Sequence, residues 1–144
     1  MEMTMNYETL DEAVYLDGTI YWASLHRPNP MSGRYELELV PDEPELVREM
    51  GVELKTKDYG NGEVEYVKIS ASTGSKYPIR VVFDDDEVEP DTLVGNGSSV
   101  RVKCELAKTF FNKKSFIKLA RPKVVRVKEL VRYSAGSRDE ELYK

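Results

Sequence analysis

Alternation of apolar and polar residues over short segments is the feature that most constrains the fold of this chain. In residues 34–40, Tyr35, Leu37 and Leu39 alternate with charged residues, which is the pattern of a half-buried strand. Seven or eight strand segments follow one another at spacings of about 8–15 residues, with one short helix among them. This succession predicts a mostly-β barrel or sandwich.

Residues that favour turns bound the predicted strands. The strands are expected over residues 14–25, 34–40, 52–57, 62–72, 77–83, 98–106, 115–120 and 124–133. Asp17-Gly18 indicates a turn or bulge inside the first segment, and Arg121-Pro122 bends the last two or places them at a sheet edge. The helix is predicted over residues 44–50, and Gly51 is expected to end it.

Length and composition predict one domain of 144 residues with a tail at each end. We expect an acidic N-terminal arm over residues 1–13, a folded domain over residues 14–133 and a flexible C-terminal tail over residues 134–144. Cys104 is the only cysteine, which excludes an internal disulfide and fits a reducing compartment. No signal-peptide pattern is present, and no apolar run approaches the roughly 18 residues that a membrane span requires.

Positive charge is concentrated in one part of the chain. Residues 101–132 contain eleven Lys or Arg and two acids, a net charge of +9, whereas the whole chain has −5, so the remainder must carry −14. Phe110, Phe111 and Phe116 lie among these cations. Cations hold a phosphate backbone by releasing its counterions, and aromatic rings stack on unpaired bases. This composition favours single-stranded nucleic acid as the ligand.

The segment 107–114 is predicted to be a basic and aromatic hairpin tip between two strands. Adjacent phenylalanines beside lysines suit a stacking finger better than a core. On the preceding strand, Arg101 and Lys103 face away from the apolar side, and an ordinary solvated strand face is the alternative interpretation. The predicted groove is centred on Arg101, Lys103, Lys113, Lys114 and Lys118.

Aromatic residues elsewhere add predicted stacking surface. Tyr21 and Trp22 are adjacent on a strand, so one ring is expected to face the core and the other the solvent. Each of the other tyrosines, taken alone, is better explained by core or rim packing. The predicted DNA-binding residues are Tyr21, Trp22, Tyr35, Tyr66, Lys68, Arg101, Lys103, Lys108, Phe110, Phe111, Lys113, Lys114, Phe116 and Lys118.

Two alternatives belong to other functional classes. Asp42, followed by Glu53 and Lys55, matches the loose pattern of Mg-dependent nucleases, in which two acids hold the metal and a lysine polarises water. The other alternative is a structural or partner-binding β-domain without affinity for nucleic acid. With His26 and Cys104 as its only histidine and cysteine, the chain offers no nucleophile–base pair and no zinc site. No catalytic residue, metal or cofactor is therefore predicted.

Four short segments carry a resemblance to a known family. They are Gly-Thr-Ile-Tyr-Trp-Ala-Ser-Leu at 18–25, Pro-Asn and Ser-Gly-Arg-Tyr-Glu within 28–36, Val-Gly-Asn-Gly-Ser-Ser-Val at 94–100, and the closing residues 127–133. In this order they resemble the single-stranded-DNA-binding proteins of tailed bacteriophages, over roughly residues 14–133. The resemblance implies an OB-fold-like five-stranded barrel with additional strands and hairpins and one short helix, which binds DNA through aromatic and basic side chains on one face.

The same resemblance implies a role. Such a protein coats exposed single strands in phage DNA replication and recombination, without sequence preference or enzymatic activity, in the cytoplasm of the infected bacterium. Single-stranded DNA is then the main partner, and a homodimer is one of the states left open. Members often recruit polymerase and helicase through an acidic tail, but residues 134–144 hold only three acids and end in Lys144, which puts that recruitment in doubt.

Overall fold

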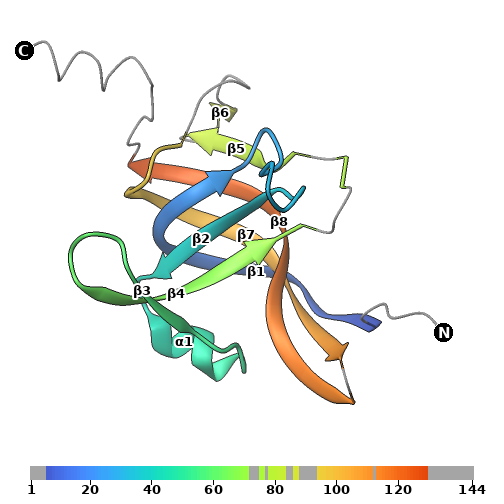
Figure 1. Ribbon diagram of the computed structural model, residues 1–144. Coiled ribbons are helices and arrows are strands. Elements are labelled where there is room, and N and C mark those ends of the chain that lie inside the picture. The colour runs from blue at the N-terminus through green and yellow to red at the C-terminus, as the bar shows by residue number, and fades with distance from the viewer. Residues whose placement is uncertain are drawn as a thin grey trace, which may run out of the picture.

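The computed structural model describes residues 6–71, 75–76, 78–83, 86–87, 94–111 and 113–129. The strands are β1 (Asn6–Ser24), β2 (Glu36–Pro41), β3 (Lys55–Asp58), β4 (Glu63–Ser70), β5 (Arg80–Phe83), β6 (Asp86–Glu87), β7 (Ser98–Phe111) and β8 (Lys114–Glu129). The helix is α1 (Pro44–Glu49). Figure 1 shows the long strands β1, β7 and β8 curving past one another, with α1 at one end of the molecule.

Five of these strands close into a barrel. Hydrogen-bonded neighbours follow the order β4-β2-β1-β7-β8, and β8 pairs back onto β4 in parallel at Ser70 and Ala120. The other pairs in this ring are antiparallel. β3 extends β4 as a hairpin, while β5 runs parallel to β8 and carries β6. A closed five-stranded barrel with these additions has the architecture of an OB-fold, so the predicted fold is confirmed.

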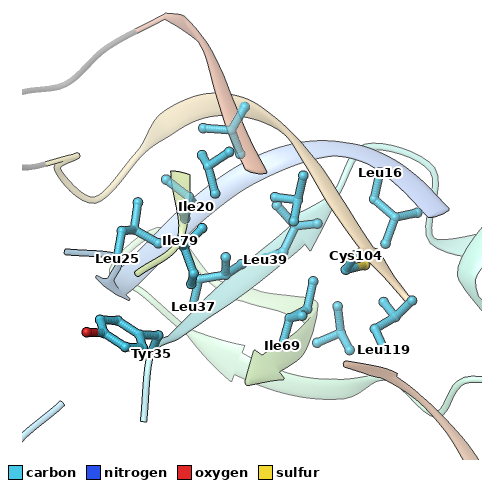
Figure 2. Packing of buried hydrophobic residues seen from close by; sticks show 14 of the residues in the cluster. Leu16, Ile20, Leu25, Tyr35, Leu37, Leu39, Ile69, Ile79, Cys104 and Leu119 are labelled. Carbon is cyan, nitrogen blue, oxygen red and sulfur yellow. The ribbon is translucent and has the colours of Figure 1, made fainter. Parts of the chain in front are cut away.

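The core fills the inside of this barrel (Figure 2). Side chains such as Ile20, Leu39 and Ile69 are completely buried, as the alternation of their strands predicts. Cys104 is buried among them, and burial together with the neighbouring Glu105 carboxylate raises the pKa of its thiol to about 12. The thiol therefore stays protonated and serves as a small apolar side chain.

Gly18 allows β1 and β2 to lie unusually close together. A Cβ atom at this position would be 2.3 Å from the backbone oxygen of Val40. Gly18 pairs with Pro41 on β2 and with Val100 on β7, so β1 continues through it. The turn or bulge predicted at Asp17-Gly18 is thus wrong. Close contact with the neighbouring strand, not a change of chain direction, requires the glycine.

β1 begins inside the segment that was predicted to be an arm. Residues 6–13 belong to β1, and Asn6 pairs with Phe110 and Thr9 with Ala107. Hydrogen bonds to β7 satisfy the backbone N–H and C=O groups of this segment whatever its side chains are. The lack of side-chain periodicity was therefore a misleading sign that the segment is not a strand. Residues 1–5, 130–133 and the predicted tail over 134–144 lie outside the described part of the chain.

The C-terminal strands are longer than predicted. The two segments expected over 115–120 and 124–133 form one strand, β8, which is irregular at Arg121, where φ is 48°. The segment predicted as a hairpin tip, 107–114, is mostly paired strand, because pairing continues to Phe111 and Lys114. The helix forms at the predicted place, with Gly51 (φ 88°) just after it. No helix in the described ranges is long and apolar enough to span a membrane.

Candidate functional site

The outer side of β1, β2 and β4 carries a row of aromatic and charged side chains. Tyr21 pairs with Glu38 on β2, and Glu38 pairs with Lys68 on β4. Ile20 before Tyr21 is buried in the core, as are the residues on either side of Glu38 and Lys68, so the three side chains point outward together. The β3–β4 hairpin adds three residues to this row. We define the tyrosine surface as Tyr21, Glu38, Lys57, Tyr59, Tyr66 and Lys68.

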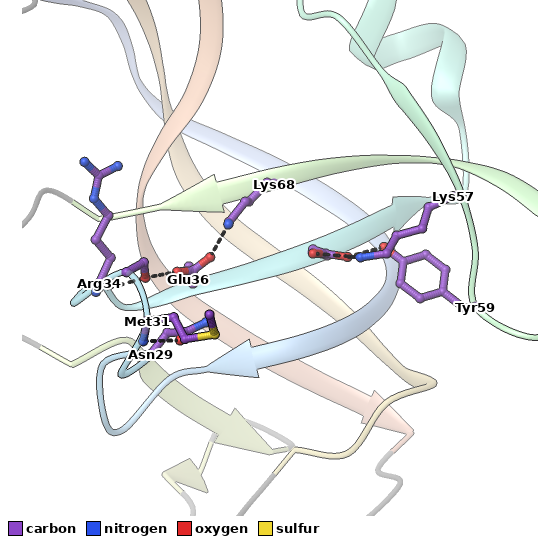
Figure 3. Close-up of polar contacts among 9 residues, drawn as sticks. Asn29, Met31, Arg34, Glu36, Lys57, Tyr59 and Lys68 are labelled. Carbon is purple, nitrogen blue, oxygen red and sulfur yellow. Dashed lines mark hydrogen bonds and ion pairs between the residues drawn. The ribbon is translucent and has the colours of Figure 1, made fainter.

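Tyr59 holds the β3–β4 hairpin against the barrel. Its ring stacks on Tyr21, with centroids 3.9 Å apart and planes 16° apart, and lies edge-on to Tyr66 at 6.1 Å. Its hydroxyl donates a hydrogen bond to Glu38 Oε1 at 2.5 Å, and Lys57 Nζ donates to the same oxygen at 3.0 Å (Figure 3). Burial, followed by the Glu38 carboxylate, raises the pKa of Tyr59.

These contacts make the tyrosine surface preformed. An aromatic pair contributes about 0.5–1.5 kcal/mol beyond its buried area, and a hydrogen bond to a charged group about 1.5–3 kcal/mol. Lys57 Nζ also lies 5.3 Å from the ring centroid of Tyr59 and 5.5 Å from that of Tyr66. Together these interactions exceed thermal energy several-fold, so the rings present a fixed arrangement to a ligand.

The loop between β1 and β2 is anchored to the edge of this surface. Glu36 is buried on the outer side of β2, where Ser32 Oγ donates a hydrogen bond to it and Lys68 Nζ lies 2.7 Å away. Burial alone would raise the pKa of Glu36, but the hydrogen bonds from Lys68 and Ser32 outweigh it and lower the pKa. A backbone hydrogen bond of 2.8 Å from Asn29 to Arg34 closes the loop.

Trp22 lies beside the tyrosine surface, in an unusual backbone conformation. Its φ is 47°, and the register of β1 and β2 shifts between Tyr21 and Ser24. The Trp22 backbone N–H donates to Asn96 Oδ1 at 2.8 Å, so the turn before β7 holds the irregularity in place. The prediction that one of the two adjacent rings faces the core is wrong. The irregularity leaves Trp22 57% exposed, while Tyr21 lies on the outer surface.

The β7–β8 hairpin divides its predicted ligand residues between two sides. On one side of the hairpin, Phe116 pairs with Thr109 and Lys118 with Ala107. On the other side, Lys108 pairs with Ile117 and Phe110 with Ser115. Lys108 Nζ lies 5.3 Å from the Phe110 ring centroid. Lys113 (φ 64°) and Lys114 are exposed at the turn. The backbone of Phe111 ends β7, but its side chain lies outside the described part of the structure.

Lys118 connects the hairpin to the tyrosine surface. Burial, and then the nearby Arg34 cation, lowers the pKa of Lys118. The Arg34 cation also acts on the Glu36 carboxylate, which lies 2.7 Å from Lys68 Nζ. β4 and β8 pair in parallel at Ser70 and Ala120, each two residues after its lysine, Lys68 or Lys118. The structure thus brings together Tyr21, Tyr66, Lys68 and Lys118 from the predicted set.

Arg101 and Lys103 lie elsewhere, on the outer side of β7 next to β1. Arg101 Nε and a second guanidinium nitrogen donate to the Asp17 carboxylate at 2.9 and 3.1 Å, and Lys128 Nζ lies 2.7 Å from it. Arg101 and then Lys128 lower the pKa of Asp17 to about 2. Lys103 Nζ lies 5.9 Å from the ring centroid of Tyr15. We define the Tyr15 surface as Tyr15, Asp17, Arg101, Lys103 and Lys128.

The position of Tyr35 does not suit the stacking role that was predicted for it. Its side chain belongs to the core cluster and is only 8% exposed (Figure 2). The alternation within residues 34–40 already placed Tyr35 on the same side as Leu37 and Leu39, and that pattern is the better guide. We therefore leave Tyr35 out of the candidate site.

Sequence reasoning missed Lys57, Tyr59 and Glu38, which complete the tyrosine surface, and Tyr15. Residues 58–61 separate the strands predicted over 52–57 and 62–72, and Gly60 has the positive φ of a turn (126°). Nothing local indicated that this turn folds over β2. For Tyr15, the alternation of β1 was a usable signal, because Val14 and Leu16 are apolar and buried.

The residues of the nuclease alternative are exposed and lie on separate elements. Asp42 follows β2, Glu53 follows α1, and Lys55 begins β3. Within the described ranges, no group of three or more His, Cys, Asp or Glu side chains is arranged to hold a metal ion.

Comparison with known proteins gives a match among solved structures. No family model matches the chain, and no curated protein does. Among solved structures, the chain is similar to gp2.5, a single-stranded DNA binding protein encoded by bacteriophage T7, with a TM-score of 0.58 and 18% sequence identity. The similarity covers 98% of this chain and 94% of that chain. At this identity the comparison establishes a shared fold.

Proposed function

We propose that this protein binds single-stranded DNA without sequence preference, with the tyrosine surface as its main contact. The observation that carries the proposal is the cluster of Tyr21, Tyr59 and Tyr66 with Lys57 and Lys68 on the outer side of β1, β2 and the β3–β4 hairpin. OB-folds bind oligonucleotides on the face formed by their second and third barrel strands, which correspond here to β2 and β4.

The chemistry of this surface favours a single strand over a duplex. Rings stack on base faces, and those faces are accessible only where bases are unpaired. Stacking contributes about 1–3 kcal/mol per base and accepts every base, because each has a π-face. Lysines contact phosphate, which is the same for all sequences. The combination therefore gives affinity without sequence readout.

The β7–β8 hairpin supplies a second wall of the proposed site. Phe116 is 47% exposed and lies on the same side of β8 as Lys118, which is close to Arg34. Lys113 and Lys114 extend the positive charge to the turn. We infer that the strand passes between this hairpin and the tyrosine surface. Lys108 and Phe110 lie on the other side of the hairpin and would meet the strand only where it leaves the site.

The biological role follows from this proposed binding. We propose that the protein protects exposed strands during phage DNA replication and recombination, in the cytoplasm of the infected bacterium, and acts by binding without chemistry. Similarity in fold to a phage single-stranded DNA binding protein supports the role. We further propose that any recruitment of polymerase or helicase involves residues 134–144, and that a homodimer is compatible with this role.

The test is a fluorescence titration of Trp22, the only tryptophan, with an unlabelled dT oligomer at two salt concentrations. We expect binding that weakens with salt, and much weaker binding to a duplex of the same length. Because Trp22 is exposed beside the site, its fluorescence should change. A gel-shift assay serves as the second readout. Absence of binding in both assays would overturn the proposal and leave the structural β-domain.

The same samples test the nuclease alternative. With Mg²⁺ present, the DNA should remain intact after incubation. Cleavage that depends on Mg²⁺ and disappears in Asp42→Ala would favour a nuclease that uses Asp42, Glu53 and Lys55. The Asp42 side chain is exposed, so the substitution should not disturb folding.

A further inference from the structure

We propose that a single strand bound at the tyrosine surface continues along the outer side of β1 onto the Tyr15 surface, which forms a second contact for the same DNA. This inference rests on the proposed function. It assigns a ligand to the Tyr15 surface, whose residues do not belong to the tyrosine surface.

β1 provides a continuous outer strip between the two surfaces. Val14, Leu16 and Ile20 are buried in the core, so the alternate residues Tyr15, Asp17, Thr19 and Tyr21 share the outer side. From Tyr21 to Tyr15 this strip is about 20 Å long, at about 3.3 Å per residue. A bound strand can therefore pass from one surface to the other without crossing the core-facing side of any strand.

Tyr15 has the features of a stacking ring. It is 58% exposed, so it contributes little to the core, and Lys103 Nζ lies 5.9 Å from its ring centroid. Among described residues, Lys103 has no acidic partner. A ring beside a lysine is the pairing that single-strand-binding proteins use for a base and its phosphate.

The charge around Tyr15 matches a phosphate chain. Arg101, Lys103, Arg126 and Lys128 share this part of the barrel with two described carboxylates, Asp17 and Glu129, the second of which pairs with Ser99 at the end of β8. Arg101 and Arg126 are directly paired across β7 and β8, and Arg101 also donates two hydrogen bonds to the Asp17 carboxylate. The surface therefore carries a local excess of positive charge in a chain whose net charge is −5.

Acidic residues fix the direction of the proposed path. A hollow beside Tyr15 and Asp17 is also lined by Asp42, Glu43 and Leu46, at the start of α1. These carboxylates repel phosphate, so the strand must turn from Tyr15 toward β7 and β8 and away from α1. The path thus crosses Lys103 and Arg101, which the sequence had assigned to the main groove.

The experiment compares dT oligomers of two lengths, about 5 and about 16 nucleotides, which span the site sizes of single OB-folds. The variants are Tyr15→Ala and Lys103→Gln, and Lys76→Gln, an exposed lysine that belongs to no strand of either surface, is the matched control. For the long oligomer we expect about a tenfold loss of affinity in Tyr15→Ala and a smaller salt dependence in Lys103→Gln. For the short oligomer we expect affinities equal to the wild type.

Each outcome has one meaning. Loss confined to the long oligomer supports the second contact. If both variants bind both oligomers with wild-type affinity, the second contact is overturned and the proposed function stays intact. The Tyr15 surface would then be available to an acidic protein partner. Equal loss at both lengths, with an unchanged unfolding transition, would also overturn it, because Tyr15 would then belong to the first contact. Failure of the wild type to bind either oligomer would overturn the proposed function itself.

Discussion

The tyrosine surface and the Tyr15 surface are made of the same kinds of residue but are assembled differently. In the tyrosine surface, three rings contact one another, and the carboxylate of Glu38 accepts hydrogen bonds from Tyr59 and Lys57. In the Tyr15 surface, a single exposed ring stands beside Lys103, and two cations hold Asp17. The tyrosine surface is rigid and its net charge is close to zero, whereas the Tyr15 surface is open and positively charged.

This difference accounts for the proposed binding of a polyanion by an acidic protein. Rigid rings lose little conformational entropy when bases stack on them, so affinity at the tyrosine surface does not require a large positive charge. Positive charge is placed instead along β7 and β8, where it borders the tyrosine surface through Lys118 and the Tyr15 surface through Arg101. We expect short oligomers to depend on rings and longer ones increasingly on charge.

The largest expected effect is a loss of stability caused by a substitution in β1, the strand that carries residues of both surfaces. In Gly18→Ala the new Cβ would meet the Val40 backbone oxygen at 2.3 Å, so β1 and β2 must separate. We expect the free energy of unfolding, measured by urea denaturation, to fall by about 3 kcal/mol. Thr19→Ala, one residue along and half-buried, is the control and should cost about 1 kcal/mol or less. Equal effects would mean that the close approach is not constraining.

Tyr21→Ala separates the roles of the two surfaces. We expect it to reduce affinity for dT oligomers of every length by about tenfold or more, because a stacked base contributes about 1–3 kcal/mol. Tyr15→Ala should reduce affinity only for long oligomers. The control is Tyr59→Phe, which keeps the ring on Tyr21 and loses only the hydroxyl bonded to Glu38. Unchanged affinity in Tyr21→Ala would remove the tyrosine surface from the binding site.

The ion pairs of Asp17 predict a pH dependence of stability. The pKa of Asp17 in the folded protein is about 2, below its ordinary value of 3.8, so the folded state favours the ionised form. The stabilisation is therefore complete above about pH 5 and is lost as the pH falls from about 4 to 2. Because the side chain is 35% exposed and screened by solvent, we expect about 1 kcal/mol.

The measurement is urea unfolding of the wild type and Asp17→Asn between pH 2 and pH 7. The difference between the two proteins should be constant at neutral pH and vanish at the acidic end. A difference that persists at pH 2 would show that Asp17 acts through packing and not through its charge.

The smallest expected effect concerns the turn of the β7–β8 hairpin. Replacing both Lys113 and Lys114 by Gln should weaken binding uniformly across sequences and reduce the slope of log affinity against log salt by about 1.4, because each phosphate contact to a single strand contributes about 0.7. If the slope for the short oligomer is unchanged, the turn does not contact DNA bound at the tyrosine surface. Lys76→Gln again controls for the change in net charge.

Local sequence patterns determined most of the fold. Alternation predicted the inward positions of Tyr35, Leu37 and Leu39, since a period of two leaves only one side of a strand apolar. The helix ended before Gly51 as expected. Composition placed the cations in the C-terminal strands and excluded a disulfide. These properties depend on residues that are near one another in the chain.

Tertiary structure alone decided which outward side chains share a surface. Alternation gives the side of a strand but not its neighbours, and Tyr21 meets Tyr59 only because the β3–β4 hairpin folds over β2. Likewise, pairing of β1 with β7 opposes Asp17 to Arg101, 84 residues away, and separates that arginine from Lys118. Pairing with β7 also makes residues 6–13 a strand despite their acidic, aperiodic sequence. Register between distant strands is set by the packing of the whole barrel, and no short segment encodes it.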